Sequence, residues 1–217
     1  MDFRLGVTDG ALGRAFETRR LGWLQVKAAR LVSELRRLRM IRAGRVHISR
    51  GGLMLAGGCS IRSLGKGTIH IGEAARFEER VLVHSEGRIE IEACVFINRD
   101  AMIVALEEIT ICRGTRIAER VSIRDHDHLL EDSTRPLNEQ GYVTGAIHIG
   151  RECWIGCNAV ILKGVTLGNR VVVGAGAVVT HDFPAGCVAV GVPARVSRTP
   201  GIVAARPEPA LPVRAAV

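Results

Sequence analysis

The sequence predicts an all-β solenoid, built from triangular coils with short strands, that follows a basic amphipathic helix. Over residues 149–179 an aliphatic side chain recurs at every sixth position, and the residue four positions after each of the first five is small or β-branched. A helix has no six-residue period and an amphipathic strand repeats every two residues, so this period is typical of stacked coils. Three short strands close one turn of about eighteen residues. The aliphatic positions are Ile149, Ile155, Ile161, Leu167, Val173 and Val179.

Residues 1–45 are expected to form the basic amphipathic helical segment. Lys27 and ten arginines against four acidic residues give this segment +7 of the chain's net charge of +8. Its apolar residues are spaced three and four apart, as on one stripe of a helix. Two interpretations are open: the helix caps an exposed end coil, or it contacts an anionic membrane surface. The stripe consists of Leu21, Leu24, Ala28, Leu31, Leu35 and Leu38.

The repeat domain is expected to span residues 46–197. The period of six continues upstream of residue 149, and two of its steps are eight residues long. Because these longer steps fall at the same place in consecutive coils, they predict a two-residue insertion at one corner. The longer steps lead from Val83 to Ile91 and from Ile103 to Ile111.

The period stops after Ile123 and resumes at Ile149, and residues 124–148 between them are polar, with Pro and Gly but no period. In a solenoid each coil contacts only its neighbours, so an insertion is expelled as a surface loop. Loops that project from a rigid scaffold often carry function. We therefore expect functional residues in this ejected loop.

Residues 198–217 are rich in Pro and Ala, lack the period and are expected to form a C-terminal tail. The apolar runs are too short for a membrane span or a signal-peptide core, which favours the cytoplasm. Peripheral contact with the inner face of the cytoplasmic membrane, through residues 1–45, is an open alternative. No nucleic-acid partner is expected, because no reader motif accompanies the basic charge.

The six cysteines do not form a recognisable metal or disulfide framework. Cys153 and Cys157 have the spacing of a ligand pair, but this spacing follows the coil period and no second pair completes it. They are interpreted as small core or coil-surface residues, and no metal site is predicted at the cysteines.

The ejected loop opens with Asp125-His126-Asp127-His128, which suits general-base chemistry. Imidazole titrates near neutrality, and a neighbouring carboxylate can fix its tautomer and stabilise its protonated form. From the residues alone, two other interpretations are open: polar side chains that close a loop, and a metal site. His126 and His128 compete for the role of base.

Several motifs, in the correct order, resemble those of the hexapeptide-repeat acyltransferases. The resemblance is closest to the sugar O-acetyltransferases, including maltose and galactoside acetyltransferases and the enzymes that modify exopolysaccharide and lipopolysaccharide. Besides the His-rich start of the loop, the motifs are Phe-Ile-Asn at 96–98, Trp-Ile-Gly at 154–156, Gly-Ala-Gly-Ala-Val-Val-Thr at 174–180 and Gly-Val-Pro-Ala-Arg at 191–195.

The resemblance implies a left-handed parallel β-helix that is active as a homotrimer. It also implies acetyl-CoA as co-substrate, bound between adjacent subunits, a saccharide acceptor, and no required metal. The handedness comes from the resemblance alone, because general rules favour right-handed crossovers.

Transferred residue by residue, the resemblance implies a catalytic centre and a CoA groove. His128 is the general base for the acceptor hydroxyl, Asp125 orients its ring and Asn98 contacts the acceptor. The backbone amide of Cys157 stabilises the tetrahedral oxyanion. The positions that contact CoA are Trp154, Gly156, Cys157, Ala175, Thr180, His181, Arg195 and Arg198; His181 stands where relatives usually have Lys.

Structural roles are open for three of these residues. Asn98 could turn a corner of the coil, Asp125 could close a loop turn, and Trp154, which should project from a corner, could form a trimer contact.

The sequence thus predicts an acetyl-CoA-dependent O-acetyltransferase that modifies a sugar or polysaccharide precursor by direct transfer in a ternary complex. An N-acetyltransferase of an amino sugar is an alternative. From other classes, a γ-type carbonic anhydrase-like zinc protein, which would need histidines such as His84, His126 and His128, and a non-catalytic β-helix scaffold are also alternatives.

Overall fold

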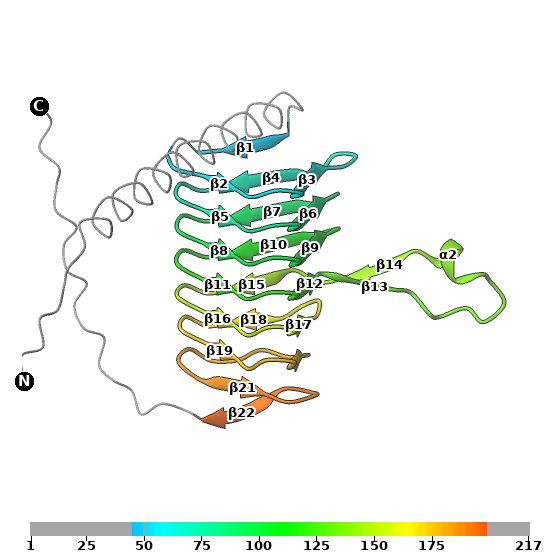
Figure 1. Ribbon diagram of the computed structural model, residues 1–217. Helices are drawn as coiled ribbons and strands as arrows, with labels where there is room; N and C mark the ends of the chain where they lie inside the picture. The colour runs from blue at the N-terminus through cyan, green and yellow to red at the C-terminus, as the bar shows by residue number, and fades with distance from the viewer. Residues whose placement is uncertain (1–44, 50, 199–217) are drawn as a thin grey trace, which may run out of the picture.

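The computed structural model describes residues 45–49 and 51–198, which form a parallel β-helix with one projecting hairpin (Figure 1). Almost all of the predicted N-terminal helical segment and C-terminal tail lie outside these described residues. None of the helices within the described ranges is long and apolar enough to cross a membrane.

Three sheets, parallel except for the last strand β22 (Arg195–Arg198), form the sides of the coils. Up to β20 (Val178–Val179), and apart from the hairpin, successive strands of the chain pass from sheet A to sheet B to sheet C. Sheet A contains β1 (Val46–Ile48), β4 (Thr68–Ile71), β7 (Arg88–Ile91), β10 (Glu108–Ile111), β15 (Ile147–Ile149) and β18 (Thr166–Leu167). Sheet B contains β2 (Met54–Leu55), β5 (Arg76–Phe77), β8 (Phe96–Ile97), β11 (Arg116–Ile117), β16 (Trp154–Ile155), β19 (Val172–Val173), β21 (Val188–Val190) and β22 (Arg195–Arg198). Sheet C contains β3 (Ser60–Ser63), β6 (Leu82–Ser85), β9 (Met102–Ala105), β12 (Ser122–Arg124), β17 (Val160–Ile161) and β20 (Val178–Val179).

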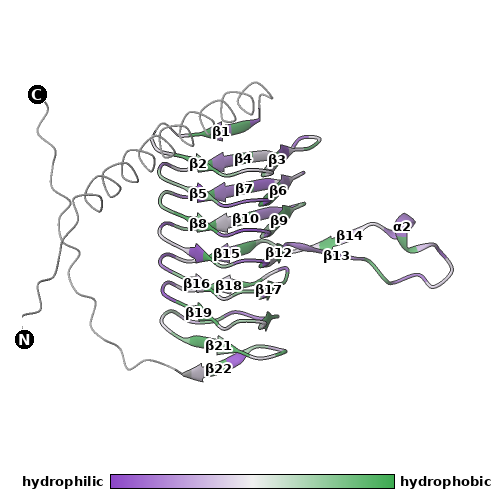
Figure 2. Cartoon of the chain, viewed as in Figure 1, coloured by the Kyte–Doolittle hydropathy of each residue, from purple (hydrophilic) through white to green (hydrophobic). Residues whose placement is uncertain are grey.

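The core is a narrow column of aliphatic side chains inside the coils. All six repeat positions predicted from Ile149 to Val179 are 0% exposed, and the small positions between them, such as Ala159 and Ala177, are also buried. In the later coils of sheets B and C, small residues such as these share the interior with one larger aliphatic side chain per strand, whereas strands of sheet A such as β7 bury two isoleucines. Hydrophilic and hydrophobic residues are interleaved along the coils (Figure 2). The predicted period is therefore confirmed as a packing pattern.

Within the described ranges, non-glycine residues with positive φ lie at two of the three corners, which we name by the sheets they join. At the B/C corner, Arg80, Asp100, Arg120 and Asn158 have φ between 56° and 59°. Asn and Asp tolerate this conformation better than most residues. Because equivalent residues stack, their side chains also pair: Arg80 Nε donates to Asp100 Oδ1 at 2.6 Å, and Arg120 Nε donates to Asn158 Oδ1 at 2.8 Å.

Glycines that follow the repeated aliphatic residues are explained by the spacing between coils. A Cβ atom added to Gly150 would lie 2.6 Å from the carbonyl carbon of Gly168, and one added to Gly156 would lie 2.6 Å from the backbone nitrogen of Ala175. Such close approach of one backbone to another requires the absence of a side chain.

The C/A corner carries all the insertions that the sequence predicted. The two steps of eight residues fall there, between β6 and β7 and between β9 and β10, and the ejected segment leaves the helix at the same corner, after β12. The excursion occupies residues 125–146, because β12 ends at Arg124 and β15 begins at Ile147; the predicted boundaries of 124–148 thus include two strand ends.

The ejected segment forms a hairpin that projects away from the coils (Figure 1). Strand β13 (His126–His128) pairs antiparallel with β14 (Tyr142–Thr144), and a short helix α2 (Leu137–Gln140) lies beyond them. Pairing between β13 and β14 thus supplies backbone partners at the base of a segment that has no solenoid period.

Candidate functional site

The predicted site residues lie at two different corners of the β-helix. Asn98, Gly156, Cys157 and Ala175 follow strands of sheet B and lie at the B/C corner, where Trp154 precedes the corner on sheet B. The other group follows strands of sheet C and lies at the C/A corner. Sheet C separates the two corners, so one chain does not bring the two groups together. The C/A group consists of Asp125, His128, Thr180 and His181.

Asp125 connects the base of the hairpin to the preceding coil. Its carboxylate is 0% exposed and accepts hydrogen bonds from the backbone amides of Leu106, at 2.9 Å, and Glu107, at 2.8 Å. Oδ1 of Asp125, which accepts the amide of Leu106, also lies 3.0 Å from Nδ1 of His126. The sequence predicted that Asp125 orients the ring of His128, but the imidazole that it contacts is that of His126.

His128 is exposed and stacks on a residue that the sequence did not single out. In the hairpin, His128 pairs with Tyr142, and their ring centroids are 4.7 Å apart with planes inclined by 38°. The ring of His126 meets Tyr142 edge to face at 5.5 Å. Asp125, His126, Tyr142 and His128 therefore form one continuous series of contacts, which we call the hairpin cluster.

The sequence contained one signal for Tyr142, since it is the single Tyr of the chain and lies in the ejected loop. The pairing of β13 with β14 could not be derived from a segment without period.

The base of the hairpin also contacts the next coil through an ion pair, in which Lys163 Nζ lies 3.1 Å from Asp127 Oδ2.

The Cys157 amide is oriented differently from its neighbours at the B/C corner. The amides of Gly156 and Asn158 donate to Val173 and Glu119 of adjacent coils, at 2.8 and 3.0 Å. Within the described ranges, the Cys157 N–H has no hydrogen-bond acceptor. This donor is therefore available to a ligand.

Asn98 has local partners at the same corner. Its Oδ1 accepts the backbone amide of Arg99 at 2.8 Å, and its Nδ2 donates to Glu119 Oε2 at 3.3 Å. These contacts fit the corner-turning interpretation, and the long bond to Glu119 leaves the amide able to contact a ligand.

Trp154 projects from sheet B with 58% of its surface exposed, as predicted. Burial in the core therefore does not explain this large apolar side chain. The nearby glycines, in contrast, are explained by the fold: a Cβ on Gly174 would meet Val190 at 2.8 Å, and Gly176 has φ +68°. Contacts between coils and backbone conformation are therefore sufficient to explain these two glycines.

The remaining predicted CoA contacts are divided between the corners. Arg195 is exposed on β22 and pairs with Val190 of β21, beside the B/C corner. The backbone of Arg198 belongs to the same strand, and its side chain lies outside the described atoms. At the C/A corner, Thr180 Oγ1 lies 3.2 Å from His181 Nδ1.

The part of the chain that the structure describes contains no group of three or more His, Cys, Asp or Glu residues placed to hold a metal ion. His84 lies on β6 and shares a 2.9 Å hydrogen bond with Ser60, and burial lowers its pKa. Burial raises the pKa of Cys153 to about 11, which agrees with its interpretation as a small core residue.

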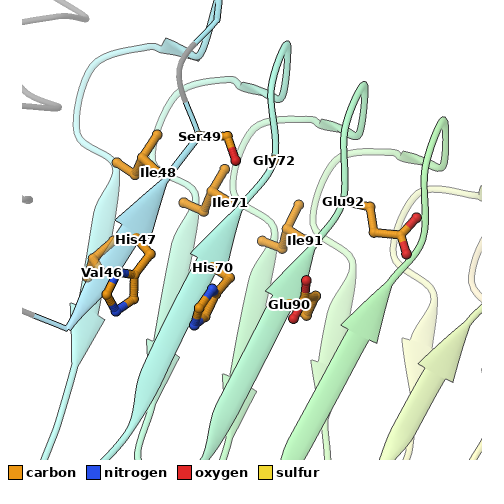
Figure 3. A pocket seen from close by; sticks show the side chains of 10 residues that line it. All are labelled: Val46, His47, Ile48, Ser49, His70, Ile71, Gly72, Glu90, Ile91 and Glu92. Carbon is orange, nitrogen blue, oxygen red and sulfur yellow. The ribbon is translucent and has the colours of Figure 1, made fainter.

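A separate cavity of about 380 Å³ lies at the N-terminal end of sheet A (Figure 3). Its lining includes His47 and His70, whose rings stack at 4.7 Å, together with Glu90 and Glu92. None of the predicted site residues lines this cavity.

Comparisons with known proteins connect the coils to a family of transferases. Residues 146–181 match the family described as bacterial transferase hexapeptide (six repeats). The chain is 33% identical over 147 residues to the putative lipopolysaccharide biosynthesis O-acetyl transferase WbbJ of Escherichia coli, covering 64% of this chain and 74% of that relative.

Two further relatives match over smaller shares of their own length. The galactoside O-acetyltransferase of Escherichia coli is 36% identical over 128 residues, or 59% of this chain and 62% of the relative. The probable acetyltransferase Rv3034c of Mycobacterium tuberculosis is 34% identical over 128 residues, or 59% of this chain and 41% of the relative.

A solved structure has a similar fold. It is a mutant of AntD, an N-acyltransferase from Bacillus cereus, in complex with dTDP and coenzyme A. The match has a TM-score of 0.58 and 21% identity, and it covers 74% of this chain and 88% of that chain.

Proposed function

Because the chain belongs to the bacterial hexapeptide-repeat transferase family, and its fold is therefore a left-handed parallel β-helix, we propose that it is an acetyl-CoA-dependent O-acetyltransferase. The acceptor is a hydroxyl of a sugar or polysaccharide precursor. The observation that carries this proposal is the hairpin cluster, which places an exposed imidazole, His128, against Tyr142 at the root of a projecting hairpin. The names of the relatives support acetyl transfer to oxygen.

In the proposed reaction His128 takes the proton of the acceptor hydroxyl while the hydroxyl oxygen attacks the thioester carbonyl carbon of acetyl-CoA. A sugar hydroxyl is a weak nucleophile at neutral pH, and a positioned base contributes typically about 10² to 10⁴-fold. The amide of Cys157, which has no acceptor within the described residues, donates to the oxyanion of the tetrahedral intermediate. When the intermediate collapses, the C–S bond breaks and the imidazolium of His128 protonates the leaving thiolate of CoA.

The complete site is proposed to form between subunits of a homotrimer. The proposed base lies at the C/A corner, whereas Asn98, Trp154 and Cys157 lie at the B/C corner. A closed ring of three copies would place the hairpin of each subunit against the B/C corner of the next. Acetyl-CoA would lie along this junction, near Trp154 and Arg195.

The proposed activity is tested by release of CoA thiol from acetyl-CoA with a panel of sugar acceptors. His128→Ala should lower kcat by about 10² or more, because the proton of the hydroxyl then has no base. Acetyl-CoA binding, measured by calorimetry, should be unchanged. If His126→Ala abolishes turnover and His128→Ala does not, the base is His126. If the protein binds no acetyl-CoA, the proposed function is wrong and the scaffold becomes the leading alternative.

The enzyme is further proposed to act in the cytoplasm, with peripheral contact to anionic membranes through residues 1–45. The support is the net charge of +7 in this segment, which would be attracted to acidic lipid headgroups. Removal of residues 1–40 should abolish cosedimentation with phosphatidylglycerol liposomes and leave CoA release on soluble sugars intact. Unchanged cosedimentation would contradict this proposal.

A further inference from the structure

One outward-facing residue from each coil forms a row across sheet B. Two of these residues are arginines in the coils on either side of Phe96, and both lie against its ring. Cζ of Arg76 is 5.7 Å from the ring centroid and Cζ of Arg116 is 5.9 Å from it. These contacts restrict the guanidinium groups, so less entropy is lost when they bind an anion. The row consists of Met54, Arg76, Phe96, Arg116, Trp154, Val172 and Val188.

The two arginines differ in how their charge is balanced. Arg76 Nε donates to Glu78 Oε1 at 2.7 Å, two residues later in the chain. Two positions after Arg116 the chain has Ala118, which offers no carboxylate equivalent to that of Glu78. Arg116 forms no ion pair with any carboxylate in the described ranges. Its guanidinium, which is always charged, is therefore available to an external anion.

Arg116 lies between the two halves of the predicted B/C site. Its strand β11 pairs with β8, which precedes Asn98, and with β16, which contains Trp154. At the corner beside it, Ala118 and Gly156 occupy the positions that Glu78 and Asn98 occupy in earlier coils. These small residues leave a surface bounded by Asn98, Arg116 and Trp154, which we call the acceptor shelf.

We infer that Arg116 binds a negatively charged group of the acceptor, so that the acceptor is an anionic saccharide, esterified with phosphate or bearing a carboxylate. Both groups match the planar fork of a guanidinium, which can donate two parallel hydrogen bonds. The inference rests on the proposed function, because it takes the acceptor to lie beside Asn98. The phosphates of CoA are the competing anion, and Arg195 is the residue proposed for them at the far end of sheet B.

The test compares Arg116→Ala with Arg113→Ala. Arg113 is an exposed arginine of the same coil at the A/B corner, so the control removes the same charge from another place. CoA release is measured with UDP-glucose as phosphate acceptor, glucuronic acid as carboxylate acceptor and glucose as neutral acceptor. Whichever charged acceptor is used better identifies the group that Arg116 binds.

Arg116→Ala should lower kcat/KM for the charged acceptor by roughly tenfold, as expected for the loss of a hydrogen bond to a charged group. The value for glucose, the KM for acetyl-CoA and all values of Arg113→Ala should stay at wild-type levels. Arg116→Lys should recover part of the loss, because it keeps the charge without the fork.

An equal loss on glucose, or a raised KM for acetyl-CoA, would overturn the inference. Independently of turnover, calorimetry on the CoA-saturated protein should detect UDP or glucuronate binding that Arg116→Ala weakens and Arg113→Ala does not. Absence of such binding, or equal binding by the wild type and Arg116→Ala, also overturns it. The proposed function fails separately, if the wild-type protein binds no acetyl-CoA.

Discussion

At the scale of single residues, two histidines with the same local sequence have different surroundings. His126 and His128 alternate with Asp125 and Asp127, and in a strand residues two apart face the same side. Both histidines therefore contact Tyr142, but only His126 reaches the buried carboxylate of Asp125. The carboxylate fixes His126 in place, whereas stacking on Tyr142 orients His128.

Tyr142 is expected to act as a positioning residue for His128. Tyr142→Ala removes the stacked ring, so kcat should fall by about tenfold or more while the KM for acetyl-CoA stays unchanged. Tyr142→Phe keeps the ring and should retain nearly full activity. Steady-state kinetics of both variants check this expectation. Loss of activity in Tyr142→Phe as well would indicate that the hydroxyl, and not the stacked ring, is required.

At the scale of elements, the hairpin is connected to the solenoid through a buried carboxylate. Asp125 is the first residue after β12, and its oxygens satisfy two backbone amides in the corner of the preceding coil. A loop with the same sequence but a different anchor would place its histidines elsewhere. The rigid coil therefore sets the position of the proposed base.

Asp125→Ala is expected to destabilise the fold by about 1–3 kcal/mol, because the amides of Leu106 and Glu107 lose their acceptors. Thermal and urea unfolding measure the change. The matched control is Asp132→Ala, farther along the ejected segment, where the carboxylate accepts from Thr134 at an exposed site. This control should leave stability within about 0.5 kcal/mol of wild type. Equal stability of the wild type and Asp125→Ala would show that water replaces the carboxylate.

At the scale of the whole molecule, the separation of the two residue groups is the main functional consequence of the fold. The β-helix has three corners, and the proposed site residues lie at two of them, the B/C corner and the C/A corner. Neither corner contains both the proposed base and the proposed oxyanion donor.

Coexpression of two variants tests whether subunits share sites. His128→Ala removes the proposed base at the C/A corner. Trp154→Ala changes an exposed side chain and should weaken acetyl-CoA binding at the B/C corner. Each variant alone should have little activity. Random mixing into trimers should restore about a quarter of the wild-type activity, because each mixed ring then contains one intact junction. Activity that stays at the level of the single variants would indicate sites within one chain.

The sequence by itself determined the architecture of the coils, their corner insertions and the segment that leaves them. This was possible because each coil packs only on its neighbours, so burial of Ile155 or Val173 is a local property that the period of six records. The motifs likewise indicated the family, as the relatives confirm. The resemblance assigned Gly156 to the CoA groove, although the close approach of the next coil is sufficient to explain a glycine at this position.

Only the tertiary structure decided which residues of the ejected segment meet and which site residues lie apart. The pairing of His128 with Tyr142 joins residues on two strands that no periodic pattern links. The contact of Asp125 with His126 depends on the direction in which the hairpin leaves the C/A corner. The separation of His128 from Cys157 follows from the winding of the chain around three sheets, a property of the complete coil that no short stretch of sequence contains.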